Sequence, residues 1–152
     1  MMGRTHLAIA ILLALVVAPF ITVPNIWMFV VLVAFGALLP DVDHESSTVN
    51  KICPVTRILP LFFKHRGFFH SIFPPIIMLS VFWFFHQEFI GLALTFGYLT
   101  HLLSDSLTHM GVNWLYPVSI WRMQGPFETG KLMESILFFT VLALIVVKLT
   151  VF

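Results

Sequence analysis

The segment between His101 and His109 carries ionisable side chains at a regular spacing. His101, Asp105 and His109 lie four residues apart. On an α-helix these positions share one face, so the three side chains would form a stripe toward one neighbour. Ionisable groups at the end of an apolar segment are costly unless they are paired or functional. We therefore predict that this stripe binds a divalent metal, with a purely structural His–Asp–His stripe as the alternative.

A second group follows an apolar segment at Leu39–His44. Asp41 and Asp43 are two residues apart and would point to the same side of an extended backbone. His44 adds an imidazole beside them. We predict that Asp41 and His44 are metal ligands and that Asp43 acts as a ligand or as a general base. The alternative is a polar turn at the end of a helix.

A third group lies at His65–Ser71. His65 and His70 are five residues apart, and Gly67 between them allows the backbone to turn so that both imidazoles converge. Arg66 is permanently charged and can hold a phosphate through two hydrogen bonds. We predict two metal ligands and a catalytic arginine here. Two interfacial histidines near a basic stretch are the alternative.

The composition identifies the solvent of this chain. It is 59% hydrophobic and 10% charged, with a mean hydropathy of +1.00, whereas a soluble domain carries about 25% charged residues. The bilayer is the solvent that such a composition fits. Cys53 is the only cysteine, which excludes an intramolecular disulfide framework and a thiolate metal cage. The chain has no basic stripe of the kind that nucleic-acid binding requires.

Five apolar segments predict an all-α, polytopic membrane protein that forms a single domain over residues 1–152. Several segments are shorter than the roughly 20 residues of an ideal span, so polar turns would complete them. The expected spans are Leu7–Thr22, Val23–Leu39, Ser71–Phe85, Phe89–Leu103 and Met133–Val151.

Five spans bring the N-terminus, residues 40–70 and residues 104–132 to one membrane face. Seven of the eight Lys and Arg residues lie on that face, with Lys148 as the exception. The positive-inside rule makes it cytoplasmic, in a bacterial-type inner membrane, with the N-terminus on the same side. Six of the seven histidines and all three aspartates share the face, and this adds His6 to the candidates. The predicted metal ligands are His6, Asp41, His44, His65, His70, His101, Asp105 and His109.

At these residues the chain resembles the membrane-bound metal-dependent hydrolases, also described as LexA-binding, inner-membrane-associated hydrolases. The resemblance covers roughly residues 3–130. It rests on Thr5-His6, Leu39-Pro40-Asp41-Val42-Asp43-His44, His65-Arg66-Gly67 with His70-Ser71, the segment from His101 to His109 with Gly111, and Gly125-Pro126-Phe127. The family is considered hydrolytic largely by inference, so the resemblance implies a class of activity rather than a particular reaction.

The order of these residues also resembles, more distantly, the superfamily of zinc-dependent phospholipase C and single-strand nucleases. Those proteins are helical phosphodiesterases with clustered zinc. This chain departs from them because no His-x-x-x-Glu follows His109. The likeness therefore implies zinc as the metal and one to three ions, with two favoured over three.

Together, these features predict a metal-dependent hydrolase at the cytoplasmic face of the inner membrane. A phosphoester of a lipid or lipid-linked molecule is the favoured substrate, since the bilayer gives lipids direct access. The alternative is a membrane scaffold or stress-response protein with a structural metal site. A transporter is disfavoured, because four of the five expected spans have no ionisable residue near their middle.

Overall fold

The computed structural model describes residues 1–43 and 67–151, and these residues form five α-helices and short 3-10 helices without a β-strand. The expected all-α fold is confirmed for this part of the chain. His44, His65 and Arg66 lie outside the described residues. The elements are α1 (Gly3–Val17), η1 (Ala18–Phe20), α2 (Ile26–Gly36), η2 (Leu39–Asp43), η4 (Phe68–His70), α5 (Phe73–Phe84), α6 (Glu88–Ser106) and α7 (Leu132–Val151).

Local sequence explains where two of the helices begin. The side chain of Asn25 accepts a hydrogen bond of 3.0 Å from the backbone N–H of Met28, which caps the N-terminus of α2. Pro74 and Pro75 occupy the first turn of α5, where a backbone N–H would have no partner within the helix. Each helix thus begins within a few residues of the apolar segment that predicted it.

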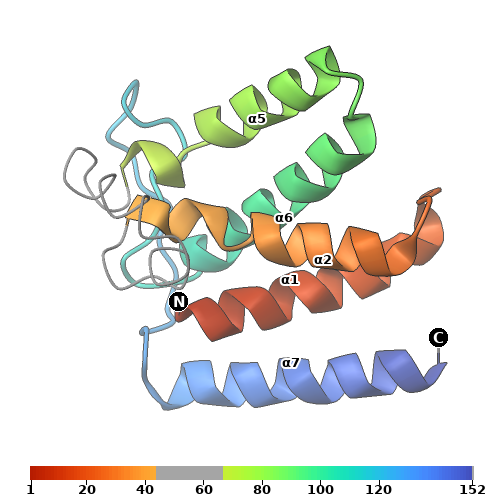
Figure 1. Cartoon of the computed structure of the whole chain (residues 1–152). Coiled ribbons are helices and arrows are strands. Elements are labelled where there is room, and N and C mark those ends of the chain that lie inside the picture. The colour runs from red at the N-terminus through yellow and green to blue at the C-terminus, as the bar shows by residue number, and fades with distance from the viewer. Residues whose placement is uncertain (44–66, 152) are drawn as a thin grey trace.

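Helix α6 lies at the centre of the arrangement (Figure 1). It packs against α2 on one side and α5 on the other, while α1 contacts both α2 and α6. Helix α7 packs on the outer side of α1. The central helix therefore carries its side chains toward three neighbours, which suits it to hold a site built from several elements.

Two glycines bring α2 and α6 into backbone contact. A Cβ atom on Gly97 would lie 2.0 Å from the carbonyl oxygen of Val33, and one on Gly36 would lie 2.2 Å from that of Leu94. The contact is reciprocal, since each helix contributes one glycine and one carbonyl group. Small residues at such a crossing allow transmembrane helices to approach closely. The crossing fixes the C-terminal end of α2 beside the middle of α6.

Three helical segments in the described part of the chain are long and apolar enough to cross a membrane. They are Gly3–Phe20, Ile26–Asp43 and Leu132–Val151. Helix α5 is apolar but shorter. Helix α6 has 19 residues, and its C-terminal turns are rich in hydroxyl and ionisable side chains. Of the five spans expected from the sequence, these three are supported by length and composition.

The connections divide between the two ends of the helices (Figure 1). The N-terminus, η2, η4, the end of α6 and the beginning of α7 lie at one end. The α1–α2 connection, the α5–α6 turn and the C-terminus lie at the other. This is the grouping predicted from the apolar segments, and it collects most of the described histidines and aspartates at one end.

Candidate metal centre

Five side chains from four elements converge at the end of the helices that holds the N-terminus. They form two overlapping groups of possible metal ligands, and within each group one donor atom per residue lies within 4.8 Å of the others. One group is His6, Asp41 and His101, and the other is His70, His101 and Asp105. His101 belongs to both, so this α6 imidazole is the centre of the cluster.

The separations between donor atoms have the size that a shared cation requires. Nε2 of His101 lies 3.6 Å from Oδ1 of Asp41 and 3.9 Å from Oδ2 of Asp105. Nε2 of His70 lies 3.8 Å from each of the same two oxygens, and Nε2 of His6 lies 3.2 Å from Oδ1 of Asp105. Ligand atoms about 2.0 Å from a tetrahedral zinc ion are about 3.3 Å apart. Most of these distances are too long for direct hydrogen bonds.

The hydrogen bonds of His101 determine which of its nitrogens is available. Nδ1 lies 2.7 Å from the backbone carbonyl oxygen of Ala37, which can only accept, so Nδ1 carries the proton. In the neutral ring, Nε2 then holds a lone pair. That atom is buried and has no hydrogen-bond partner among the described residues. His101 therefore presents an electron pair to the two carboxylates.

His6 is fixed in the same way by Ser104. The hydroxyl of Ser104 donates its proton to the carbonyl oxygen of His101 at 2.9 Å. Nδ1 of His6 lies 2.7 Å from the same hydroxyl oxygen and must therefore be the donor in that contact. The imidazoles of His6 and His101 stack, with ring centroids 3.7 Å apart. The amino group of Met1 also contacts Oδ1 of Asp105, beside Nε2 of His6.

His70 lies between two aspartates of the short helix η2. Its Nε2 faces Asp41, and its Nδ1 lies 3.3 Å from Oδ2 of the buried Asp43. A carboxylate on the far nitrogen is the usual support of a metal-binding imidazole. The condition under which Asp41 and Asp43 would share a side, an extended backbone, is not met, because Leu39–Asp43 is a 3-10 helix. At three residues per turn, Asp41 and Asp43 point in different directions, and they reach opposite sides of one ring.

The predicted stripe on α6 includes His101 and Asp105 but not His109. The helix ends at Ser106, and the hydroxyl of Thr108 donates a hydrogen bond of 2.7 Å to the carbonyl oxygen of Asp105. His109 lies beyond this end, is exposed, and belongs to neither ligand group. The expectation that His109 continues the stripe is wrong, because it required three further residues of helix beyond Ser106.

Access to the cluster is uneven. The side chain of Asp41 is 22% exposed, whereas those of His6, His70 and His101 are fully buried and that of Asp105 nearly so. Trp114 donates a hydrogen bond of 2.9 Å to the hydroxyl of Ser106, and this packs the segment after α6 against the helix end. Among the five donors, Asp41 is therefore the one with a substantially exposed side chain.

Two supporting groups had no clear signal in the sequence. Ser104 lies one helical turn after His101, but its contact with His6 joins residues 98 positions apart. The carbonyl oxygen of Ala37 belongs to the backbone, so no residue type in the sequence could indicate its role.

Glu134 at the start of α7 accepts backbone hydrogen bonds of 2.6 Å from Met2 and Gly130, which ties α7 to the beginning of α1.

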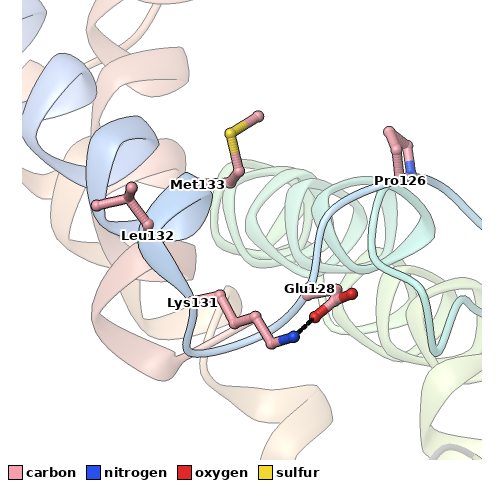
Figure 2. A pocket seen from close by; sticks show the side chains of 5 residues that line it. All are labelled: Pro126, Glu128, Lys131, Leu132 and Met133. Atoms are coloured by element: carbon pink, nitrogen blue, oxygen red, sulfur yellow. Dashed lines mark ion pairs between the residues drawn. The ribbon is translucent and has the colours of Figure 1, made fainter.

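A separate pocket of about 450 Å³ lies where the chain enters α7 (Figure 2). It is lined by Pro126, Glu128, Lys131, Leu132 and Met133, and Glu128 forms an ion pair with Lys131. The hydrogen bond and positive charge of Lys131 hold the pKa of Glu128 below its usual value. Both side chains are exposed, so water screens the pair and it contributes little to stability. No residue of this pocket belongs to the metal-ligand groups.

Comparison with known proteins gives a family and two informative relatives. The family model described as "YdjM inner membrane protein" matches residues 1–151. The chain is 32% identical over 108 residues to "Inner membrane protein YdjM" of Escherichia coli (strain K12), covering 66% of this chain and 54% of the relative. It is 31% identical over 107 residues to "Uncharacterized protein YvsG" of Bacillus subtilis (strain 168), covering 68% of this chain and 66% of the relative.

The chain thus spans about half the length of the first of these relatives. No solved structure matches it. The family match extends across all the described helices and includes every residue of the candidate metal centre. On this evidence the chain is a membrane protein and belongs to the YdjM inner membrane protein family.

Proposed function

We propose that this protein is a metal-dependent hydrolase with a divalent metal centre, zinc being the favoured ion and two ions the favoured number. The ligands within the described residues are His6, Asp41, His70, His101 and Asp105. The observation that carries the proposal is the lone pair on Nε2 of His101, which is buried and directed at two carboxylates. His44 and His65, outside the described residues, are the further expected ligands.

A cation resolves an electrostatic conflict in this cluster. A lone pair on a neutral imidazole and a carboxylate oxygen repel each other, and burial strengthens the repulsion because the local dielectric constant is low. His6 and His101 both have Nδ1 fixed as the donor, so their Nε2 atoms meet Asp105 and Asp41 as acceptors. A divalent metal satisfies all of these acceptors at once. Three imidazoles with two carboxylates form a donor set that suits zinc.

The residues of the chain have separable roles in this proposal. A bound metal of this kind polarises a phosphoryl oxygen and makes water acidic enough to supply hydroxide at neutral pH. Ala37 and Ser104 hold the rings of His101 and His6 in the binding orientation. Asp43 orients His70 through Nδ1, the nitrogen away from the other ligands. The general-base role expected for Asp43 stays a prediction. Arg66 is expected to hold the phosphate.

The proposed substrate is a phosphoester of a lipid or a lipid-linked molecule. The cluster lies at the ends of apolar helices, at the level where α1 and α7 begin. In a membrane this is where polar headgroups meet the hydrocarbon layer. We further propose that all five helices cross the bilayer and that the cluster faces the cytoplasm, as the distribution of Lys and Arg predicts.

Metal analysis tests the proposal most directly. Wild-type protein and the Asp105→Ala variant would be purified in detergent, dialysed against trace zinc, and measured by inductively coupled plasma mass spectrometry. We expect stoichiometric metal in the wild type and a large loss in the variant. A metal-free wild type, or equal metal in both, contradicts the metal centre. Hydrolysis of a phospholipid or lipid phosphate, abolished by a chelator and restored by zinc, then tests the enzyme.

A structural metal site in a membrane scaffold is the second candidate, and the near-complete burial of four of the five donors favours it. Structural zinc sites are closed, whereas catalytic sites keep one position open to substrate. The two functions predict different behaviour of Arg66→Ala. In an enzyme this variant keeps its metal and its folding stability but loses activity. In a scaffold only the ligand variants have a phenotype, and they lose metal and stability together.

A further inference from the structure

An apolar groove of about 500 Å³ lies in the half of the molecule away from the candidate metal centre. It is bounded by the α1–α2 connection, by Leu79 of α5 and by one side of α6. Phe29 of α2 lines its wall together with Leu92 and Phe96 of α6. The α1–α2 connection and the start of α6 lie together at the end of the bundle that holds the C-terminus (Figure 1).

The length of the groove matches one leaflet of a bilayer. Along α6 its lining begins at Phe89 and ends at Leu99. Ten residues of α-helix rise about 15 Å, which is half of the roughly 30 Å hydrocarbon thickness of a membrane. In the proposed arrangement, in which α6 crosses the bilayer, the groove extends from one membrane face to about the middle of the bilayer, the depth that a single acyl chain occupies.

The lining of the groove has almost no polar groups that could bind a polar ligand. It contains no charged side chain, and its two hydroxyl groups belong to Thr22 and Thr95. Thr95 donates its proton to the carbonyl oxygen of Pro75 at 3.5 Å, within the protein. Thr22 is exposed in the α1–α2 connection, at the mouth of the groove. A hydrocarbon chain is the occupant that fits such walls.

The groove is open to the lipid-facing surface. Two of its lining residues, Ile21 and Leu92, are exposed at 43% and 52%. Val31, Ile77 and Leu103, on the three helices that bound the groove, are likewise exposed apolar residues. Since lipid is the solvent of exposed apolar side chains in a membrane protein, lipid can reach the groove at Ile21 and Leu92.

We propose that this groove binds one acyl chain of a phospholipid from the leaflet opposite the candidate metal centre. The bound lipid fills the space between α2, α5 and α6 and stabilises their packing. The site is independent of the proposed hydrolase, because the groove and the ligand cluster share no residue: on α6 the groove lining ends at Leu99 and the ligands begin at His101. The proposal stands whether or not the protein is an enzyme.

The test uses the full chain in nanodiscs made with a phosphatidylcholine that carries a photoreactive diazirine in the middle of one acyl chain. After irradiation, labelled peptides are quantified by mass spectrometry. We expect the label to concentrate on Phe89–Leu99 and on the α1–α2 connection, several-fold above the lipid-facing surface of α7. Equal labelling of α6 and α7 overturns the proposal.

A substitution that fills the groove sharpens the result. Leu92→Trp is expected to reduce labelling of α6 to the level of α7, while Leu144→Trp, on the exposed surface of α7, leaves the pattern unchanged. Leu99→Trp serves as a second filling variant if Leu92→Trp unfolds. Undiminished labelling in a folded filling variant contradicts the proposal. So does a Leu92→Cys variant that cross-links to Leu92→Cys of a second copy of the chain, since a second copy would then occupy the groove.

Discussion

Nδ1 of His101 donates a hydrogen bond of 2.7 Å to the backbone carbonyl oxygen of Ala37. This contact joins the functional half of α6 to the residue that follows α2. One helical turn earlier on α6, Gly97 lies against the backbone of Val33. The close crossing of two helices thus determines where the carbonyl oxygen of Ala37 stands, and so which nitrogen of His101 faces the carboxylates.

Replacing Gly97 by Ala tests this dependence. The new methyl group would lie 2.0 Å from the carbonyl oxygen of Val33, a backbone atom that cannot rotate away. We expect α2 to move away from α6 and the free energy of unfolding to fall by about 1–3 kcal/mol. Metal affinity should fall as well, because the His101–Ala37 contact lengthens. Thermal unfolding in detergent and zinc titration measure the two effects.

Leu103→Ala is the matched control for Gly97→Ala, since Leu103 lies on the same helix with its side chain 53% exposed. It should leave both the zinc affinity and the unfolding midpoint close to wild type. If Gly97→Ala behaves like this control, the crossing does not position the metal centre.

His101→Ala should remove more metal than any other single histidine substitution, because this imidazole belongs to both ligand groups. We expect mass spectrometry to find much less than one zinc ion per chain in this variant. His109→Ala, eight residues further along, should retain wild-type zinc because His109 is exposed beyond the end of α6. Loss of zinc in the His109 variant would show that the sequence-based stripe describes the metal-bound protein better than the structure does.

Ser104→Ala should weaken zinc binding without removing a ligand. The hydroxyl of Ser104 accepts from Nδ1 of His6 and thereby keeps Nε2 directed at Asp105. Loss of such a supporting contact typically reduces metal affinity about 10–100-fold. Competition against a chromogenic zinc chelator measures the change.

Ser106→Ala removes a hydroxyl two residues away that bonds Trp114 and the backbone of Leu102 instead. It should therefore alter stability but not zinc affinity. Equal zinc affinities for the two serine variants would argue against the role assigned to Ser104.

Asn25→Ala should destabilise α2 without affecting the metal centre at the other end. Asn25 caps this helix through the backbone N–H of Met28, and loss of such a cap costs about 1 kcal/mol. Asn25→Asp should retain most of the stability, because a carboxylate accepts the same hydrogen bond. A large loss of bound zinc in Asn25→Ala, at full folding, would mean that the two ends of the helices are more strongly coupled than the contacts indicate.

The sequence by itself determined the helical class and the membrane solvent, because both follow from local physical properties. The apolar segments are long enough to form helices, whichever segments they pack against. Because the chain has so few charged residues, it cannot build an aqueous surface around these helices, and they require a bilayer. The spacing of His101 and Asp105 placed both on one side of a helix, which depends only on the helical repeat. The order of segments also predicted which connections meet at one end.

The tertiary structure decided which donors meet and what supports them. The end of α6 at Ser106 excluded His109, and the 3-10 geometry of Leu39–Asp43 sent Asp41 and Asp43 to opposite sides of His70. The proton positions on His6 and His101 depend on Ser104 and on the carbonyl oxygen of Ala37, each supplied by a different helix. Such contacts join residues far apart in the chain. They are set by how closely two helices can pack, a property that no local pattern of residues records.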